Sequence, residues 1–213
     1  MMLNFKHCEY CGVVLGKKLG FVSKPGFKYG DGRLICHTCH STAIKNDEQL
    51  YQVWAYVKKC FDYLGLEVKW PLVTLQLLNK PELQIGLGGN TVGSAQFAIY
   101  PTKVDSKVSV LYGMPKLLAL ETLAHEIGHV WCKQQCVKFK PNPMQEEGFC
   151  NVLSCLVLKS LPEDADVRHR IKMLFKNPDP VYGGHFRTQW ASLETLSWPD
   201  YKYQIHTSSY VQC

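Results

Sequence analysis

Long apolar runs are missing from this 213-residue sequence, and none reaches the roughly 20 residues that a membrane-spanning helix needs. The first residues, MMLNFKHCEYCG, put a histidine and two cysteines where a secretory leader requires an uninterrupted apolar stretch. Internal repeats and low-complexity tracts are also lacking. We therefore expect a soluble, cytoplasmic protein with no membrane partner. The chain has 46% hydrophobic and 20% charged residues, which is typical of a globular protein with one substantial core.

The net charge is small outside the N-terminal fifth of the chain. Residues 1–45 carry seven Lys/Arg against two Asp/Glu, so they account for five of the six net positive charges. Such asymmetry can signal an anionic partner such as nucleic acid. Four zinc-bound thiolates in this segment would, however, lower its charge to +3. Nucleic acid is therefore not the partner that we expect.

The sequence contains ten cysteines. In a reducing compartment this count favours metal ligands or packed free thiols over disulfides. Four of them form two C-x-x-C pairs: Cys8, Cys11, Cys36 and Cys39. The second pair follows a predicted hairpin that turns at residues 30–32, and two such turns facing each other would supply four thiolates to one structural Zn²⁺. The alternatives are unliganded thiols, or a site in which His37 or His40 replaces a cysteine.

The periodicity of the remaining chain predicts helices around a small sheet. Residues 46–65 have helical apolar spacing, with Asn46 or Asp47 as the cap and Gly65 at the end. Residues 66–112 contain Gly/Asn turns and short β-branched runs, which predict strands. Residues 115–135 predict a strong helix, and QEEGFCNVLSCLVLKSL predicts a second apolar helix after a break at KPNPM. The fold class is therefore α+β.

The stretch LAHEIGHVW, residues 123–131, lies within the first of these two helices. His125 and His129 are four residues apart, so they project from one face and can reach the same ion. Glu126 is rotated by about 100° from His125, so it lies beside such an ion and can take a proton from a water. The H-E-x-x-H pattern is typical of zinc hydrolases. Two histidines without metal are the alternative, which the apolar flanks disfavour because unpartnered buried imidazoles are costly.

A catalytic zinc needs a third protein ligand and leaves one position for water. The downstream candidates are Cys132, Cys136, Glu146, Glu147 and His185. Cys136 is about 16 Å from His125 along the helix axis and cannot share the ion. Cys132 is more simply explained as a packed free thiol. The segment QEEGFCNVL is the better choice, because it can cross behind the first helix with its carboxylates at the start of an apolar face.

These motifs resemble the glutamate zincins, in which a glutamate on a second helix completes a His, His, Glu site. In the zinc aminopeptidases of that group the ligand glutamate directly precedes Gly-Phe, which implies Glu147 as the ligand and Glu146 as the fallback. LYGMPKLLALETLAHEIGHVW, EEGFCNVLSCLVL and PVYGGHFR are similar to the C-terminal peptidase domain of the plant LIM-domain peptidases that restrict organ growth and are activated by ubiquitin. DGRLICHTC resembles the end of the LIM-like zinc module before that domain. The similarity runs from about Cys8 to about Arg187.

The resemblance implies a gluzincin-like zinc peptidase core at residues 46–213, made of a small sheet, an active-site helix and a glutamate helix. A zinc-ribbon or LIM-like module would occupy residues 1–45. It also implies an endopeptidase that acts on protein or peptide substrates, with one catalytic and one structural Zn²⁺. The sequence has no counterpart of the family's ubiquitin-interacting helices or of a complete LIM pair, so ubiquitin-related regulation is not carried over.

The predicted mechanism uses Glu126 as the base that activates water. A further donor should stabilise the oxyanion, and the candidates in VYGGHFR are Tyr182, His185 and Arg187. The alternative for Tyr182 is a packed residue in a Gly-rich turn. The strand KVSVLYG, just before the active helix, is a candidate edge strand with which an extended substrate pairs.

Two other functions compete with the endopeptidase. One is a non-catalytic zinc-ribbon adaptor that binds nucleic acid or an acidic protein through basic residues of the N-terminal module: Lys17, Lys18, Lys24, Lys28 and Arg33. The other is a zinc aminopeptidase. It would need an acidic pocket for the substrate's free amine, and Glu146 is the nearby acid that the sequence offers.

Overall fold

The structure is a computed structural model and describes residues 6–16, 26–84, 91–135 and 142–207. The N-terminal elements are β1 (Lys6–His7), β2 (Val14–Leu15), β3 (Phe27–Lys28), β4 (Leu34–Ile35) and α1 (His37–Ser41). The central elements are α2 (Asp47–Tyr63), η1 (Trp70–Leu72), β5 (Val73–Leu78), α3 (Lys80–Gln84), β6 (Gly93–Ile99) and β7 (Val104–Leu111). The C-terminal elements are α4 (Lys116–Gln135), α5 (Pro143–Lys159), α6 (Ala165–Lys176), η2 (Pro180–Gly184), α7 (His185–Thr195) and α8 (Trp198–Thr207). The mixture confirms the α+β class.

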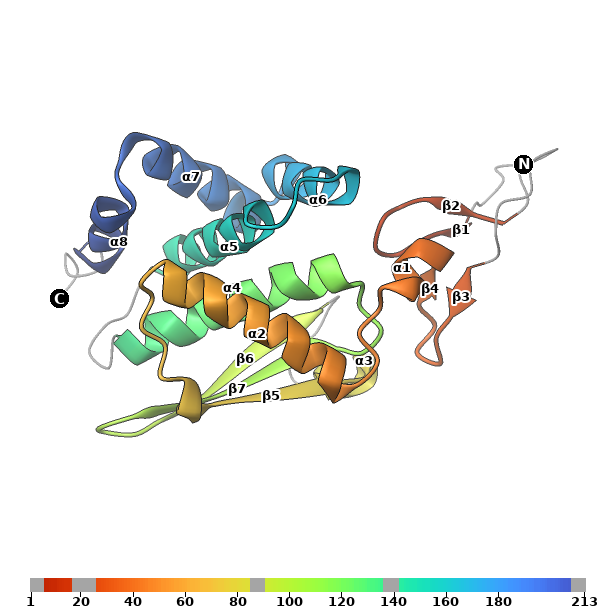
Figure 1. The fold of residues 1–213 in the computed structure, drawn as a ribbon, viewed down its shortest axis with the longest axis horizontal. Coiled ribbons are helices and arrows are strands. Elements are labelled where there is room, and N and C mark those ends of the chain that lie inside the picture. The colour runs from red at the N-terminus through yellow and green to blue at the C-terminus, as the bar shows by residue number, and fades with distance from the viewer. Residues whose placement is uncertain (1–5, 17–25, 85–90, 136–141, 208–213) are drawn as a thin grey trace.

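The first four strands form two antiparallel hairpins at one end of the molecule, β1 with β2 and β3 with β4 (Figure 1). The second hairpin turns where the sequence predicts, because the Tyr29 N–H donates to the Arg33 carbonyl and Gly32 has a φ of 91°. A small buried cluster holds the hairpins together and consists of Cys8, Leu15, Ile35 and Cys36. Among the described residues of this part of the chain the cluster is small, so a metal cross-link would add to its stability.

Helix α2 forms as predicted from its cap and its apolar spacing. The Asn46 side chain accepts a hydrogen bond from the Gln49 N–H, and the chain leaves the helix at Gly65, whose φ is 62°. The residues that α2 buries share one face: Leu50, Val53, Val57 and Phe61. That face belongs to the main hydrophobic core.

The predicted sheet is present and has three strands in the order β5-β7-β6. β5 runs parallel to β7, whereas β6 pairs antiparallel with β7. The prediction that KVSVLYG is an edge strand is therefore wrong. β7 is flanked on both sides, because β5 and β6 both pair with it. Its alternate residues Val108 and Val110 are completely buried. β6 is the outer strand of the sheet that contacts α4.

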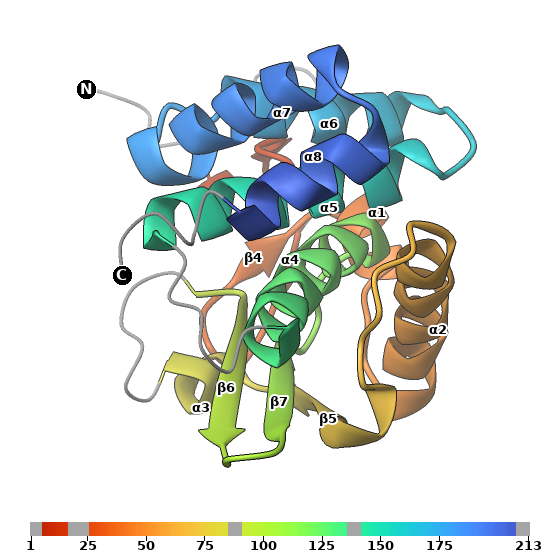
Figure 2. The ribbon, with the colours of Figure 1, turned by 90° about the vertical axis from the view of Figure 1, so that its left-hand side faces the viewer.

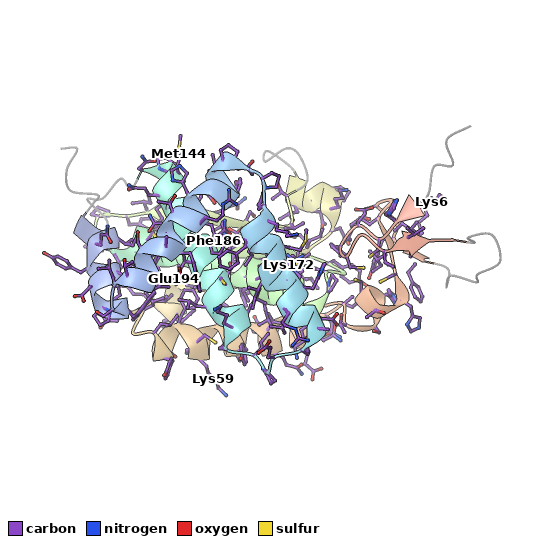
Figure 3. The ribbon with its side chains drawn as sticks, turned by 90° about the horizontal axis from the view of Figure 1, so that it is seen from above. Lys6, Lys59, Met144, Lys172, Phe186 and Glu194 are labelled. Atoms are coloured by element: carbon purple, nitrogen blue, oxygen red, sulfur yellow. The ribbon has the colours of Figure 1, made fainter. Side chains whose placement is uncertain are left out.

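Helices cover one face of the sheet in two layers. α4 lies across β6 and β7, and α5, α7 and α8 lie on the far side of α4 (Figure 2). Seen from above, Lys6 marks the N-terminal hairpins at one end, and Glu194 and Met144 mark the helical layer toward the other (Figure 3). Both predicted helices are confirmed as α4 and α5. α5 begins inside the predicted break, since Pro143 occupies its first turn and Asn142 caps it by accepting from the Met144 N–H.

The N-terminal hairpins are connected to the start of α4 through a short ladder. Ala43 bridges to Pro115, the Ile44 N–H donates to the Met114 carbonyl at 2.8 Å, and the Gly113 N–H donates to the Ile44 carbonyl at 2.7 Å. The segment that leaves the hairpins is thus hydrogen-bonded to the loop that precedes α4. None of the helices in the described ranges is long and apolar enough to cross a membrane.

Candidate metal centres

Helices α4 and α5 cross closely, and Gly128 is at the contact. A Cβ atom at Gly128 would lie 2.8 Å from Sγ and 3.2 Å from Cα of Cys150, so a larger residue would push the helices apart. The contact places the first turns of α5 against the middle of α4. As a result, Glu147 on α5 faces His125 and His129 on α4.

Three ligand atoms converge at this crossing. Nε2 of His125 lies 3.1 Å from Nε2 of His129 and 3.1 Å from Oε2 of Glu147. Nε2 of His129 lies 3.5 Å from Oε1 of Glu147. Ligands held at about 2.0–2.1 Å from a tetrahedral zinc would be about 3.3 Å apart. The three residues therefore have the spacing of a metal site.

The chemistry of these groups also fits a cation. Although burial raises its pKa, hydrogen bonds from His125 and His129 lower the pKa of Glu147 to about 2. Burial lowers the pKa of His129, but Glu146 and Glu147 outweigh this and raise it to about 10. Oε2 of Glu147 is buried and faces Nε2 of His125 at 3.1 Å. The site therefore favours positive charge at its centre, and a divalent ion can supply it.

Each imidazole is fixed from behind by a second residue. Nδ1 of His129 lies 2.8 Å from Oε1 of Glu146, whose other oxygen accepts from Lys133 at 3.0 Å. Nδ1 of His125 lies 2.9 Å from the side-chain oxygen of Asn151. Such partners orient the ring and leave Nε2 free for the metal. Glu146 is the fallback ligand of the sequence analysis. It thus lies on the side of His129 that faces away from His125 and Glu147.

Glu126 lies beside the ligands on the wall of a cavity of about 450 Å³. Its side chain is largely buried. Burial raises the pKa of Glu126, while His125, His129 and the Ala95 N–H of β6 partly offset that increase. The residue therefore has the position beside the metal site that the helical spacing predicts.

The three oxyanion candidates occupy different environments. Tyr182 lines the cavity, and its ring centroid lies 6.3 Å from that of His125. The segment around it is a π-helical turn rather than the expected Gly-rich loop, because Asp179 caps it by accepting from the N–H groups of Val181 and Tyr182. The Tyr182 carbonyl accepts from the Asn151 amide at 2.8 Å, which connects this turn to the His125 partner.

His185 and Arg187 follow at the start of α7. The backbone of His185 packs against Gly148 of α5, where a Cβ atom would lie 2.8 Å from its carbonyl oxygen. The Arg187 guanidinium donates to the carbonyls of Phe175 and Asn177 at 3.1 and 2.8 Å. In this conformation Arg187 stabilises the end of α6. Neither residue lines the cavity beside Glu126.

The four predicted cysteines form the other candidate metal group. The Sγ atoms of Cys8, Cys11, Cys36 and Cys39 all lie within 4.8 Å of one another. The separation between Cys11 and Cys36 is 3.6 Å, close to the roughly 3.8 Å expected of thiolates around a tetrahedral zinc. His40 stacks on Phe27 at 3.7 Å between ring centroids, so it has another role in this structure.

The proposed basic surface of the N-terminal module is smaller than the sequence suggests. Arg33 is 2% exposed and pairs with Asp31 at 2.7 Å, so it is not available to a nucleic acid. Lys28 is exposed. Lys17, Lys18 and Lys24 lie outside the described residues, as does Cys136.

Sequence reasoning missed Asn151 and Lys133. Asn151 follows Glu147 by four residues, so it lies on the same face of α5, and a lone amide within an apolar helix was a usable signal. Lys133 follows His129 by the same spacing, but it acts by pairing with Glu146, which lies on another helix. No single-helix pattern could have identified it.

The described residues contain two candidate metal centres. One is the His, His, Glu group at the crossing of α4 and α5, and the other is the four-cysteine cluster. Residues 89–173 match the family described as "DA1-like: Protein DA1", and this segment contains the whole His, His, Glu group. "Protein DA1-related 2" of Arabidopsis thaliana is 45% identical over 167 residues, which cover 61% of this chain and 31% of that protein. The chain thus spans about a third of that relative's length. No solved structure matches. The chain is therefore similar to DA1-family proteins over these segments.

Proposed function

We propose that the protein is a zinc-dependent endopeptidase with a gluzincin-like core. The observation that carries this proposal is the convergence of His125, His129 and Glu147 on one point, with Glu126 beside them on a cavity wall. These three residues would hold the catalytic ion, and the four cysteines would hold a structural one. When bound, Zn²⁺ would lower the pKa of a water and polarise the carbonyl of the peptide bond.

The residues of the chain would perform the remaining steps. Glu126 would accept a proton from the water and pass it to the leaving amine. Asn151 and Glu146 would keep the two imidazoles in the tautomer that presents Nε2. Tyr182, which also lines the cavity, would donate a hydrogen bond from its hydroxyl to the developing oxyanion. An extended substrate would lie along β6, whose first residue, Gly93, lines the same cavity.

An aminopeptidase is less well supported than an endopeptidase. The acid that the sequence offered for a free amine is Glu146, and its two oxygens are occupied by His129 and Lys133. A nucleic-acid adaptor is less well supported because Arg33 is buried against Asp31. We therefore propose protein or peptide substrates and do not propose nucleic acid as the partner.

Replacing Glu126 with Gln tests the proposal. Zinc-loaded wild type and Glu126→Gln would be incubated with a library of peptides of mixed sequence, and new termini would be identified by mass spectrometry. We expect wild-type cleavage at internal peptide bonds and a loss on the order of 10³-fold in the variant, because the general base is removed. Zinc content should be equal in both. Undiminished cleavage by the variant would contradict the mechanism, and release of single N-terminal residues would favour the aminopeptidase.

A further inference from the structure

The cavity beside the metal ligands extends along α4 well beyond the reacting centre. Its walls include Thr122, Glu121 and Leu118, which precede His125 by three, four and seven residues. At 1.5 Å per residue, Leu118 is about 10 Å from His125 along the helix axis. A substrate that is positioned for attack at the metal would place a neighbouring side chain in this space.

Glu121 belongs to this wall, and the proposed mechanism does not use its carboxylate. Arg170 of α6 donates to it twice, from Nε at 2.8 Å and from Nη2 at 2.6 Å, and both bonds go to Oε2. Within the described ranges no residue donates a hydrogen bond to Oε1. Arg170 therefore fixes the carboxylate through one oxygen and leaves the other available.

The neighbouring polar groups are already engaged. The Ser154 hydroxyl donates to the Glu121 carbonyl at 2.8 Å, and the Thr122 hydroxyl contacts Sδ of Met114 at 3.6 Å. The side chain of Glu121 keeps 13% of its surface exposed. Even with Arg170 beside it, burial raises the pKa of the Glu121 carboxyl, so the carboxylate would gain from a second positive partner.

We infer that Glu121 selects a basic side chain, lysine or arginine, next to the scissile bond of the substrate. Leu118 and Val92 offer apolar surface to the methylene stem, and Oε1 of Glu121 accepts from the charged end. Arg170 is a positioning residue for Glu121. This inference rests on the proposed function, because it assigns a substrate class to the same site.

The test compares cleavage and binding in matched variants. Wild type, Glu121→Gln, Glu163→Gln and the double variant Glu121→Met/Arg170→Met would be loaded with zinc and given the mixed peptide library. Glu163 is an exposed acid that pairs with Arg168 away from the cavity, so its variant controls for the substitution itself. The double variant replaces the buried pair with apolar side chains, which avoids an unpaired Arg170. Zinc content and melting temperature would show whether each variant is folded.

We expect cut sites in wild type and in Glu163→Gln to be enriched in lysine or arginine at one flanking position. For a lysine peptide, Glu121→Gln should lower kcat/KM about tenfold, as expected for the loss of a charged hydrogen bond. A norleucine peptide of the same length should change less than twofold. The double variant should prefer norleucine over lysine.

Binding separates this inference from the proposed function. Fluorescently labelled forms of the lysine and norleucine peptides would be titrated with Glu126→Gln and with Glu126→Gln/Glu121→Gln to measure their binding affinities. Suppose that wild type cleaves none of the peptides while binding of the lysine peptide still depends on Glu121. In that case the proposed function fails and the assignment of Glu121 stands. Cleavage whose lysine preference is absent, or is unchanged in both Glu121 variants, would overturn the inference and leave the pair as an interhelical contact. A preference for acidic side chains that the double variant abolishes would overturn the inference, because Arg170 would then be the residue that selects the substrate side chain. If no variant cleaves or binds these peptides, both proposals fail.

Discussion

Nδ1 of His129 and Oε1 of Glu146 are 2.8 Å apart, on the side of the imidazole that faces away from Glu147. The two adjacent glutamates of EEGF therefore have different positions, although the sequence offers them as alternatives. Glu147 points its carboxylate between the two histidines, and Glu146 supports one of them from behind. This division follows from the helix, since neighbouring residues are rotated by about 100° and cannot point to the same place.

The two candidate metal centres should be separable by mutation. Wild type should bind two zinc ions per chain by elemental analysis, and His125→Ala/His129→Ala should retain one. The converse variant, Cys36→Ser/Cys39→Ser, should lose the other ion, because two thiolates cannot hold a structural zinc. If wild type holds one zinc and the histidine variant keeps it, the H-E-x-x-H pair is not a metal site and the adaptor becomes the better interpretation.

Glu146→Gln should weaken binding of the catalytic zinc by about 10- to 100-fold, because the partner that orients His129 loses its charge. Competition with a zinc chelator would measure the affinity. Glu163→Gln is the matched control, since Glu163 is 73% exposed. Equal affinity in both variants would mean that the contact between Glu146 and His129 has no role in metal binding.

Tyr182→Phe should lower kcat about 10²-fold with little change in KM, because the hydroxyl is proposed to act only on the developing oxyanion. Tyr63→Phe provides the control, since the Tyr63 side chain is 91% exposed on the far end of α2. The measurement is steady-state cleavage of the best peptide from the library. An unchanged kcat would assign Tyr182 to the cavity wall alone.

Gly113→Ala should destabilise the protein by about 1–3 kcal/mol. Gly113 has a φ of 77°, and a Cβ atom there would lie 2.6 Å from the Tyr29 ring, at the contact between the hairpins and the start of α4. Urea unfolding of the zinc-loaded protein measures the change. Gly30→Ala is the control, because no atom lies within 4 Å of a Cβ at Gly30. A Gly113→Ala effect no larger than the control's would show that this contact can rearrange without loss of stability.

The sequence by itself determined the elements that depend on local patterns. The cap at Asn46, the turn at Gly32 and the spacing of His125 and His129 all follow from interactions within a few residues. For the same reason the two C-x-x-C pairs could be identified as thiolate donors. The division of the chain at residue 45 and the identity of the metals stay predictions.

Only the tertiary structure decided which of these elements meet. The placement of β7 in the middle of the sheet depends on its partners, β5 and β6, and the burial of Arg33 depends on Asp31 and the fold of the hairpin. Which of the two glutamates meets the Nε2 atoms, and the pairing of Glu121 with Arg170, depend on how α4 packs against α5 and α6. Helical period fixes the direction in which a side chain leaves its own helix, but what it contacts is set by packing against distant residues.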